Sequence, residues 1–133
     1  MTRQRPSMGF LGRFGRSYDL RQLDDALKAL DLHPNLVPEA VKITVVNLMK
    51  DHATGGDPPP RSYGAAAAIL AYCMIGADGF AGANGEAMAH DVEARIEEAL
   101  NVGDSFDARL ILLTLHAGVI QPSVVDRFRL EAE

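Results

Sequence analysis

The chain has a single cysteine, Cys73, among its 133 residues. One cysteine excludes a framework of internal disulfides and is typical of a protein from a reducing compartment. We therefore expect a cytoplasmic protein. Because Cys73 lies within an apolar stretch, we expect its thiol to be buried, with a raised pKa, and not to act as a catalytic nucleophile.

Long apolar segments are also lacking. The most apolar segment, residues 64–75, has twelve residues without a formal charge, whereas a membrane-spanning helix needs roughly 20 apolar residues. Residues 1–17 do not contain the continuous apolar stretch of a secretory signal. We expect neither a transmembrane segment nor export. The short uncharged segment is instead typical of a helix that other helices surround.

Basic side chains are few and unevenly distributed. The chain has 18 acidic residues against 13 Lys and Arg, a net charge of −5. Residues 1–18 contain four arginines and no acid, so the remainder holds nine basic and eighteen acidic side chains, a net −9. Nucleic-acid phosphates would repel so acidic a surface, so we do not expect nucleic acid to be a partner of this part.

Residues 1–17 are expected to form a flexible basic arm. Its arginines alternate with Phe10, Leu11 and Phe14, and its three glycines disfavour a helix. Met8 could be a second start site. One alternative function is weak peripheral binding of membrane or nucleic acid through this arm, since each arginine near an anionic membrane contributes about 1 kcal/mol.

The remaining residues, 18–133, are assigned to a single helical domain. Hydrophobic residues make up 47% of the chain and charged residues 23%, as in ordinary globular proteins. Residues 51–61 contain two glycines and three consecutive prolines and form an exposed linker. Neither side of this linker is large enough for a good core of its own, so one domain is expected.

The spacing of apolar residues predicts an all-α protein of five to six helices. The run 41–46 is β-branched and could form a strand, but Pro38 and Glu39 are helix start signals. Two helices, 62–75 and 105–117, are nearly uncharged, and we place both at the centre of a compact bundle. The other helices are expected over 19–31, from Pro38 onward, over 86–101 and from Pro122 onward.

Finer features of these helices can also be predicted. Residues 76–85 contain four glycines and are expected to form an irregular turn with Phe80 as its anchor. Asp104, followed by Asp107, resembles a capping box for the fifth helix. Spacing of four residues predicts ion pairs within single helices, namely Asp24 with Lys28 and Asp91 with Arg95.

Three residues in loops are candidates for a functional site. His52 and Asp57 flank two glycines in the linker, and loops often carry catalytic groups. Asp78 lies in the glycine-rich 76–85 segment. That segment follows a helix and lacks the pattern of a dinucleotide, phosphate or calcium loop.

A fourth candidate, His90, shares a predicted helix face with three glutamates. Histidine and glutamate one turn apart are ligand-type residues, as in di-iron bundles. However, no second helix offers matching ligands, so an ordinary solvated face is the preferred interpretation. The glutamates are Glu86, Glu93 and Glu97.

The sequence does not define an enzyme. It has no recognisable nucleophile motif and no metal-ligand spacing, so we expect no metal and no cofactor. The preferred hypothesis is a protein-interaction or self-associating module, because residues 65–68 are alanines that permit close helix approach, and because apolar helical surface exceeds what two central helices need. The alternative is a small-molecule-binding protein or enzyme with a site near residues 51–61 and 76–85.

Overall fold

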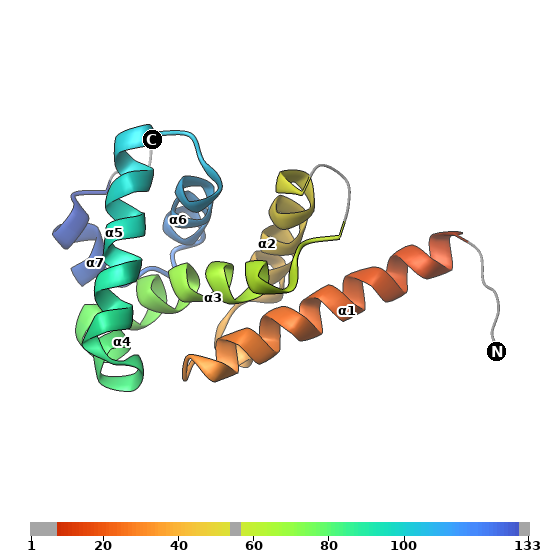
Figure 1. Ribbon diagram of the computed structural model, residues 1–133, viewed down its shortest axis with the longest axis horizontal. Coiled ribbons are helices and arrows are strands. Elements are labelled where there is room, and N and C mark those ends of the chain that lie inside the picture. Colours follow the sequence, from red (N-terminus) through yellow and green to blue (C-terminus); the bar gives the residue numbers. More distant parts are fainter. Residues whose placement is uncertain (1–7, 54–56, 131–133) are drawn as a thin grey trace.

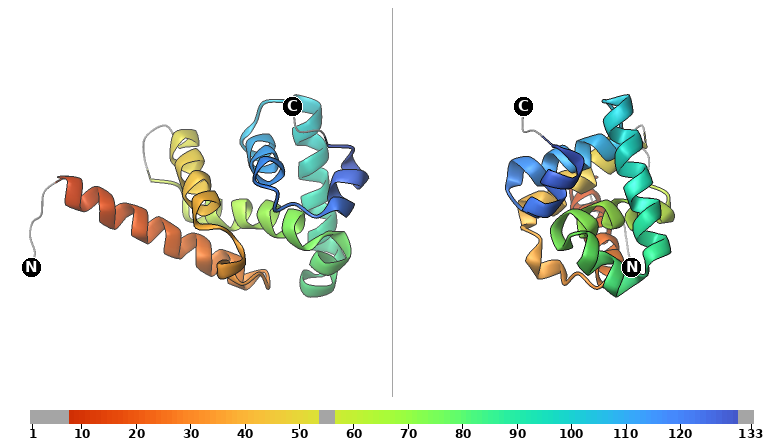
Figure 2. Two further views of the ribbon diagram at one scale, coloured as in Figure 1. Left: turned by 180° about the vertical axis from the view of Figure 1, so that it is seen from behind. Right: turned by 90° about the vertical axis from the view of Figure 1, so that its left-hand side faces the viewer.

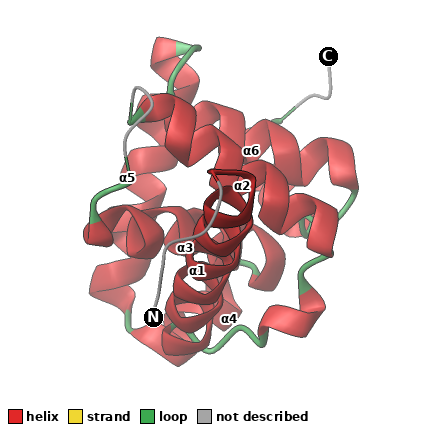
Figure 3. Cartoon of the chain, turned by 90° about the vertical axis from the view of Figure 1, so that its right-hand side faces the viewer, coloured by secondary structure: helices red, strands yellow, loops and turns green. Residues whose placement is uncertain are grey.

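The computed structural model describes residues 8–53 and 57–130, with side chains from residue 17 onward. These residues form seven α-helices and a 3-10 turn, η1, without any strand (Figures 1 and 3). The all-α prediction is confirmed, although the described chain has seven helices and not five to six. Their bounds are α1 Met8–Ala29, η1 Pro34–Leu36, α2 Glu39–His52, α3 Pro60–Ile75, α4 Ala77–Asn84, α5 Glu86–Val102, α6 Phe106–Ala117 and α7 Pro122–Phe128.

The additional helix is α4, in the segment where an irregular turn was expected. That prediction is wrong because the sharp bends are confined to Gly76 and Gly85, with φ of 95° and 96°. Glycine adopts such positive φ values without a steric cost. Between these two bends, alanines favour a short helix despite two further glycines. Phe80 is fully buried, which confirms it as the anchor of the segment.

Helix α1 begins at Met8, eleven residues before the expected start at position 19. No proline interrupts residues 7–33, and extending an anchored helix costs much less than starting one, even through three glycines. The N-terminal half of α1 extends away from the other helices (Figures 1 and 2). Residues 1–7 of the predicted flexible arm lie outside the described residues.

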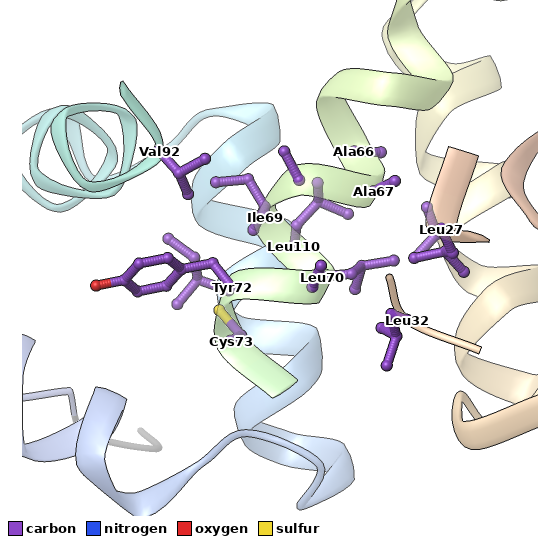
Figure 4. Close-up of a cluster of buried hydrophobic side chains, with 14 of the residues drawn as sticks. Leu27, Leu32, Ala66, Ala67, Ile69, Leu70, Tyr72, Cys73, Val92 and Leu110 are labelled. Atoms are coloured by element: carbon purple, nitrogen blue, oxygen red, sulfur yellow. The ribbon is translucent and has the colours of Figure 1, made fainter. Parts of the chain in front are cut away.

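Helix α3 is the centre of the bundle and packs against α1, α4, α5 and α6. Nine of its residues between Tyr63 and Cys73 are buried. Leu27 of α1, Val92 of α5 and Leu110 of α6 surround it (Figure 4). The prediction that other helices surround residues 64–75 is confirmed. Enclosure by four helices explains why these residues carry no charge.

Helix α6 was expected to be equally central, and the structure supports this on one face only. It packs against α2, α3 and α5 and buries Leu110, Ile111 and Thr114. Leu112, on the same helix, is 42% exposed. The apolar character of α6 therefore exceeds what its neighbours in the described chain cover.

The thiol of Cys73 is buried within α3, as predicted. Burial raises the pKa of Cys73 to about 11, and a hydrogen bond with Thr114 opposes this in part. A thiol with this pKa is protonated at neutral pH and is a poor nucleophile.

Asp19 joins three helices through a buried polar contact. Its carboxylate accepts a hydrogen bond of 2.5 Å from the Tyr63 hydroxyl of α3 and lies 3.1 Å from Lys50 Nζ of α2. Burial, and then the hydrogen bond to Asp19, raise the pKa of Tyr63. The contact satisfies a carboxylate that would otherwise be costly to bury.

The predicted ion pairs within single helices are wrong. Asp24 lies 3.1 Å from Lys42 Nζ of α2, and Arg95 pairs with Asp107 of α6 at 2.9 Å. Among the described residues, neither Lys28 nor Asp91 takes part in an ion pair. Both observed pairs are partly buried, where screening by water is weaker than at an exposed helix surface.

We predict that Asp19→Ala lowers the free energy of unfolding by about 2–4 kcal/mol, because it leaves a buried hydroxyl and a lysine without their partner. Urea unfolding followed by circular dichroism measures this loss. The matched control is Asp25→Ala, an exposed acid of the same helix, which should change stability by less than about 0.5 kcal/mol. Equal effects of the two substitutions would contradict the role of Asp19.

Candidate functional site

A hollow lies where the end of α2 meets the starts of α3 and α6 and the second half of α5. His52, the last residue of α2, is exposed there. Its ring centroid lies 5.2 Å from that of Phe106, the first residue of α6, with 30° between the planes. Three adjoining cavities of about 540, 490 and 330 Å³ are lined by both residues.

Capping of α6 places Phe106 at the hollow. Ser105 is the N-cap, and its hydroxyl accepts a hydrogen bond of 3.1 Å from the backbone N–H of Ala108. The prediction that Asp104 caps this helix is therefore wrong by one residue. Asp104 instead lies 3.3 Å from Arg109 Nη2, in an exposed pair.

The most constrained charge at the hollow is Arg95 of α5. Its Nη2 and Nε donate to the two carboxylate oxygens of Asp107, at 2.9 and 3.1 Å. The same Nη2 donates to the carbonyl of Ala65 in α3, at 3.0 Å. A bidentate guanidinium held in this way ties three helices together and has few donors left for a ligand.

Charges of both signs surround the rest of the hollow. Asp51, Glu98 and Arg61 also line it and form no ion pair among the described residues. Acids and bases are thus nearly balanced, so the hollow has no evident preference for an anion or a cation. No group of three or more His, Cys, Asp or Glu residues within the described ranges is arranged to hold a metal.

Of the four predicted candidates, only His52 lies at this hollow. Asp57 is exposed just before α3, Asp78 is exposed in the first turn of α4, and His90 is exposed on α5. None of these three lines the cavities around His52. Five residues of the 51–61 segment line these cavities, whereas no residue of 76–85 does.

Glu93, expected on a solvated face beside His90, is instead largely buried. It accepts a hydrogen bond of 2.6 Å from the Tyr72 hydroxyl and lies 3.3 Å from Arg127 of α7. Burial, and then this hydrogen bond, raise the pKa of Tyr72. Glu93 thus connects α3, α5 and α7.

A second surface feature was not located from the sequence: an apolar groove of about 250 Å³ between α5 and α6. Leu100 and Leu112, 43% and 42% exposed, lie on its two walls. The signal in the sequence was a helix that is apolar on nearly all sides. The other lining residues are Ala99, Gly103, Ala108, Ile111, Leu115, Arg129 and Leu130.

Comparison with known proteins assigns no function, so the proposals below rest on the geometry of the described residues. No protein-family model matches the chain, and no curated protein or solved structure matches it significantly. Within residues 8–53 and 57–130, every helix is too short or too polar to cross a membrane.

We predict that Arg95→Gln lowers the free energy of unfolding by about 1–3 kcal/mol, because Asp107 and the Ala65 carbonyl lose their donor in a partly buried position. The control is Arg109→Gln, which removes an exposed pair and should cost less than about 1 kcal/mol. Chemical denaturation of both variants tests this. If the two losses are the same, Arg95 does not hold the three helices together.

Proposed function

We propose that this protein is a self-associating interaction module and that the groove between α5 and α6 is its contact surface. The exposed pair Leu100 and Leu112 within a single apolar groove carries this proposal. Isolated exposed leucines are common on soluble proteins, but a shared apolar depression is typical of an interaction site. Arg129 is the one charged residue among its described lining residues.

The groove has the composition of an interface centre. Apolar side chains line it, while charged residues such as Glu97 lie on the exposed surface of the same helix, and this resembles the apolar core and polar rim of protein interfaces. Burying the exposed halves of two leucines contributes about 2–3 kcal/mol. These two leucines alone do not offset the cost of association, so the other apolar lining residues of the groove must be buried with them.

We predict that Leu112→Asp weakens self-association at least roughly tenfold, because a carboxylate in the groove must be desolvated against apolar walls. Sedimentation velocity at protein concentrations from about 10 µM to about 1 mM measures the change in the dissociation constant, because weak interfaces have dissociation constants in this range. Circular dichroism of the variant should remain that of the native chain, since Leu112 is already partly exposed.

The matched control is Leu36→Asp. Leu36 is 65% exposed in η1, which connects α1 to α2 and does not line the groove. This variant should associate like the native chain. A native chain that remains monomeric at every concentration would refute the proposal, and equal weakening by both substitutions would refute the assignment of the surface.

Binding of a small molecule at the His52 hollow is the second candidate function. The contact between His52 and Phe106 supports it, because an exposed imidazole beside an aromatic ring offers both a flat apolar surface and hydrogen-bonding nitrogens. The openness of the hollow to solvent and the internal pairing of Arg95 and Arg109 make it the weaker candidate.

This candidate predicts that some compound in a metabolite panel shifts the NMR resonances of the His52 ring at concentrations that leave His33 and His116 unchanged. His33 and His116 are exposed, do not line the cavities of the hollow and serve as internal controls. Phe106→Ala should then weaken the shift several-fold, because the stacking surface is lost. A panel that never perturbs His52 selectively would rule the candidate out.

A further inference from the structure

The charge of α5, one wall of the groove, indicates what kind of segment fits beside it. Helix α5 contains five acids and one arginine, a net −4. The opposite charge in the chain is concentrated in residues 1–18, which hold four arginines and no acid. We infer that the groove of one copy binds the N-terminal half of α1 from a second copy, an inference that rests on the proposed function.

The position of α1 makes this segment available to another copy. The start of α1 and the pair α5 and α6 lie toward opposite ends of the longest axis (Figures 1 and 2). Among the side chains described in α1, burial begins at Asp19, and Tyr18 is 53% exposed. The chain's own groove is thus far from its own projecting helix, whereas the groove of a neighbour can be reached.

The length and sequence of the projecting helix fit an apolar groove. Residues 8–18 form about three turns, roughly 16 Å of helix. In the sequence, Phe10, Phe14 and Tyr18 follow one another at intervals of four residues. This is the spacing by which an amphipathic helix places successive anchors along a groove.

The charges around these anchors are complementary to α5. Arg13 and Arg16 are interspersed with the aromatic residues of the segment. Glu97 of α5, three residues before the groove residue Leu100, is exposed and forms no ion pair among the described residues. Arg129 is the single charged lining residue, and its charge is unfavourable toward the arm, whereas Glu97 is favourable.

The contact joins two different surfaces, so it is heterologous. It either repeats into a chain of copies or closes as a reciprocal pair. In both cases each single contact needs an intact arm on one copy and an intact groove on the other. Two defective variants should therefore restore the contact when they are mixed.

The test uses three full-length proteins: the native chain, a groove variant Leu112→Asp, and an arm variant Arg13→Glu/Arg16→Glu. Each variant alone should associate roughly tenfold or more weakly than the native chain. An equimolar mixture should form a 1:1 heterodimer through the arm of the first variant and the groove of the second. Sedimentation velocity measures association, and native mass spectrometry identifies the heterodimer by its mass.

A charge-preserving variant, Arg13→Lys/Arg16→Lys, is the matched control for the arm. It should associate within about twofold of the native chain, because lysine keeps the positive charge at both positions. Raising the salt concentration from about 0.05 M to about 0.5 M should weaken native association by screening these charges. Unchanged circular dichroism of every variant shows that the fold is retained.

The outcomes separate this inference from the proposed function. If the arm variant associates like the native chain while the groove variant does not, the groove meets another surface and the inference is overturned, but self-association stands. If the mixture fails to restore a heterodimer, the inference is also overturned. If the native chain is monomeric throughout, the proposed function and the inference both fail.

Discussion

The enclosure of α3 is the constraint on which the rest of the structure depends. A sixteen-residue helix with a nearly continuous buried stretch must be covered on all sides, and four other helices do this. The small side chains of Ala66 and Ala67 face these neighbours without enforcing a wide separation (Figure 4). Close packing around the apolar helix α3 explains why a chain of 133 residues can be stable without disulfides.

Two polar contacts of the same type fix the position of α3 relative to its neighbours. Near each end of α3 a tyrosine hydroxyl donates to a carboxylate of another helix, and a cation from a third helix lies beside that carboxylate. At the start the hydroxyl is that of Tyr63, and later along the helix it is that of Tyr72. The first group joins α1, α2 and α3, and the second joins α3, α5 and α7. A carboxylate with both partners is satisfied when buried, so each group specifies a packing arrangement.

The C-terminal end of α3 is completed by the segment before α7. The backbone N–H of Gln121 donates to the carbonyl of Cys73 at 2.8 Å, and its side-chain amide donates to Met74 at 2.9 Å. Carbonyls at the end of a helix have no partner within the helix, so a buried end needs such donors. The short α7 is thereby fixed to the core although it has only seven residues.

What could be predicted from the sequence was local. Two predictions follow from composition along a few turns: that the uncharged segment is a helix enclosed by others, and that Cys73 is buried. Both are confirmed. The ion pairs and the role of Glu93 depend on which helices meet, so spacing along one helix pointed to the wrong partners or to solvent. His52 was a candidate from its loop, but its ring partner Phe106 is 54 positions away in the sequence. The α5–α6 groove could not be located for the same reason, since residues of both helices line it.

The two direct connections in the middle of the chain have a consequence for its evolution. A single glycine joins α3 to α4, and a single glycine joins α4 to α5, both at positive φ. With no spare length at either joint, one added or deleted residue would rotate every later helix against the core. We expect changes in chain length to be tolerated before α1 and between α2 and α3, while residues 60–102 keep a constant length across species.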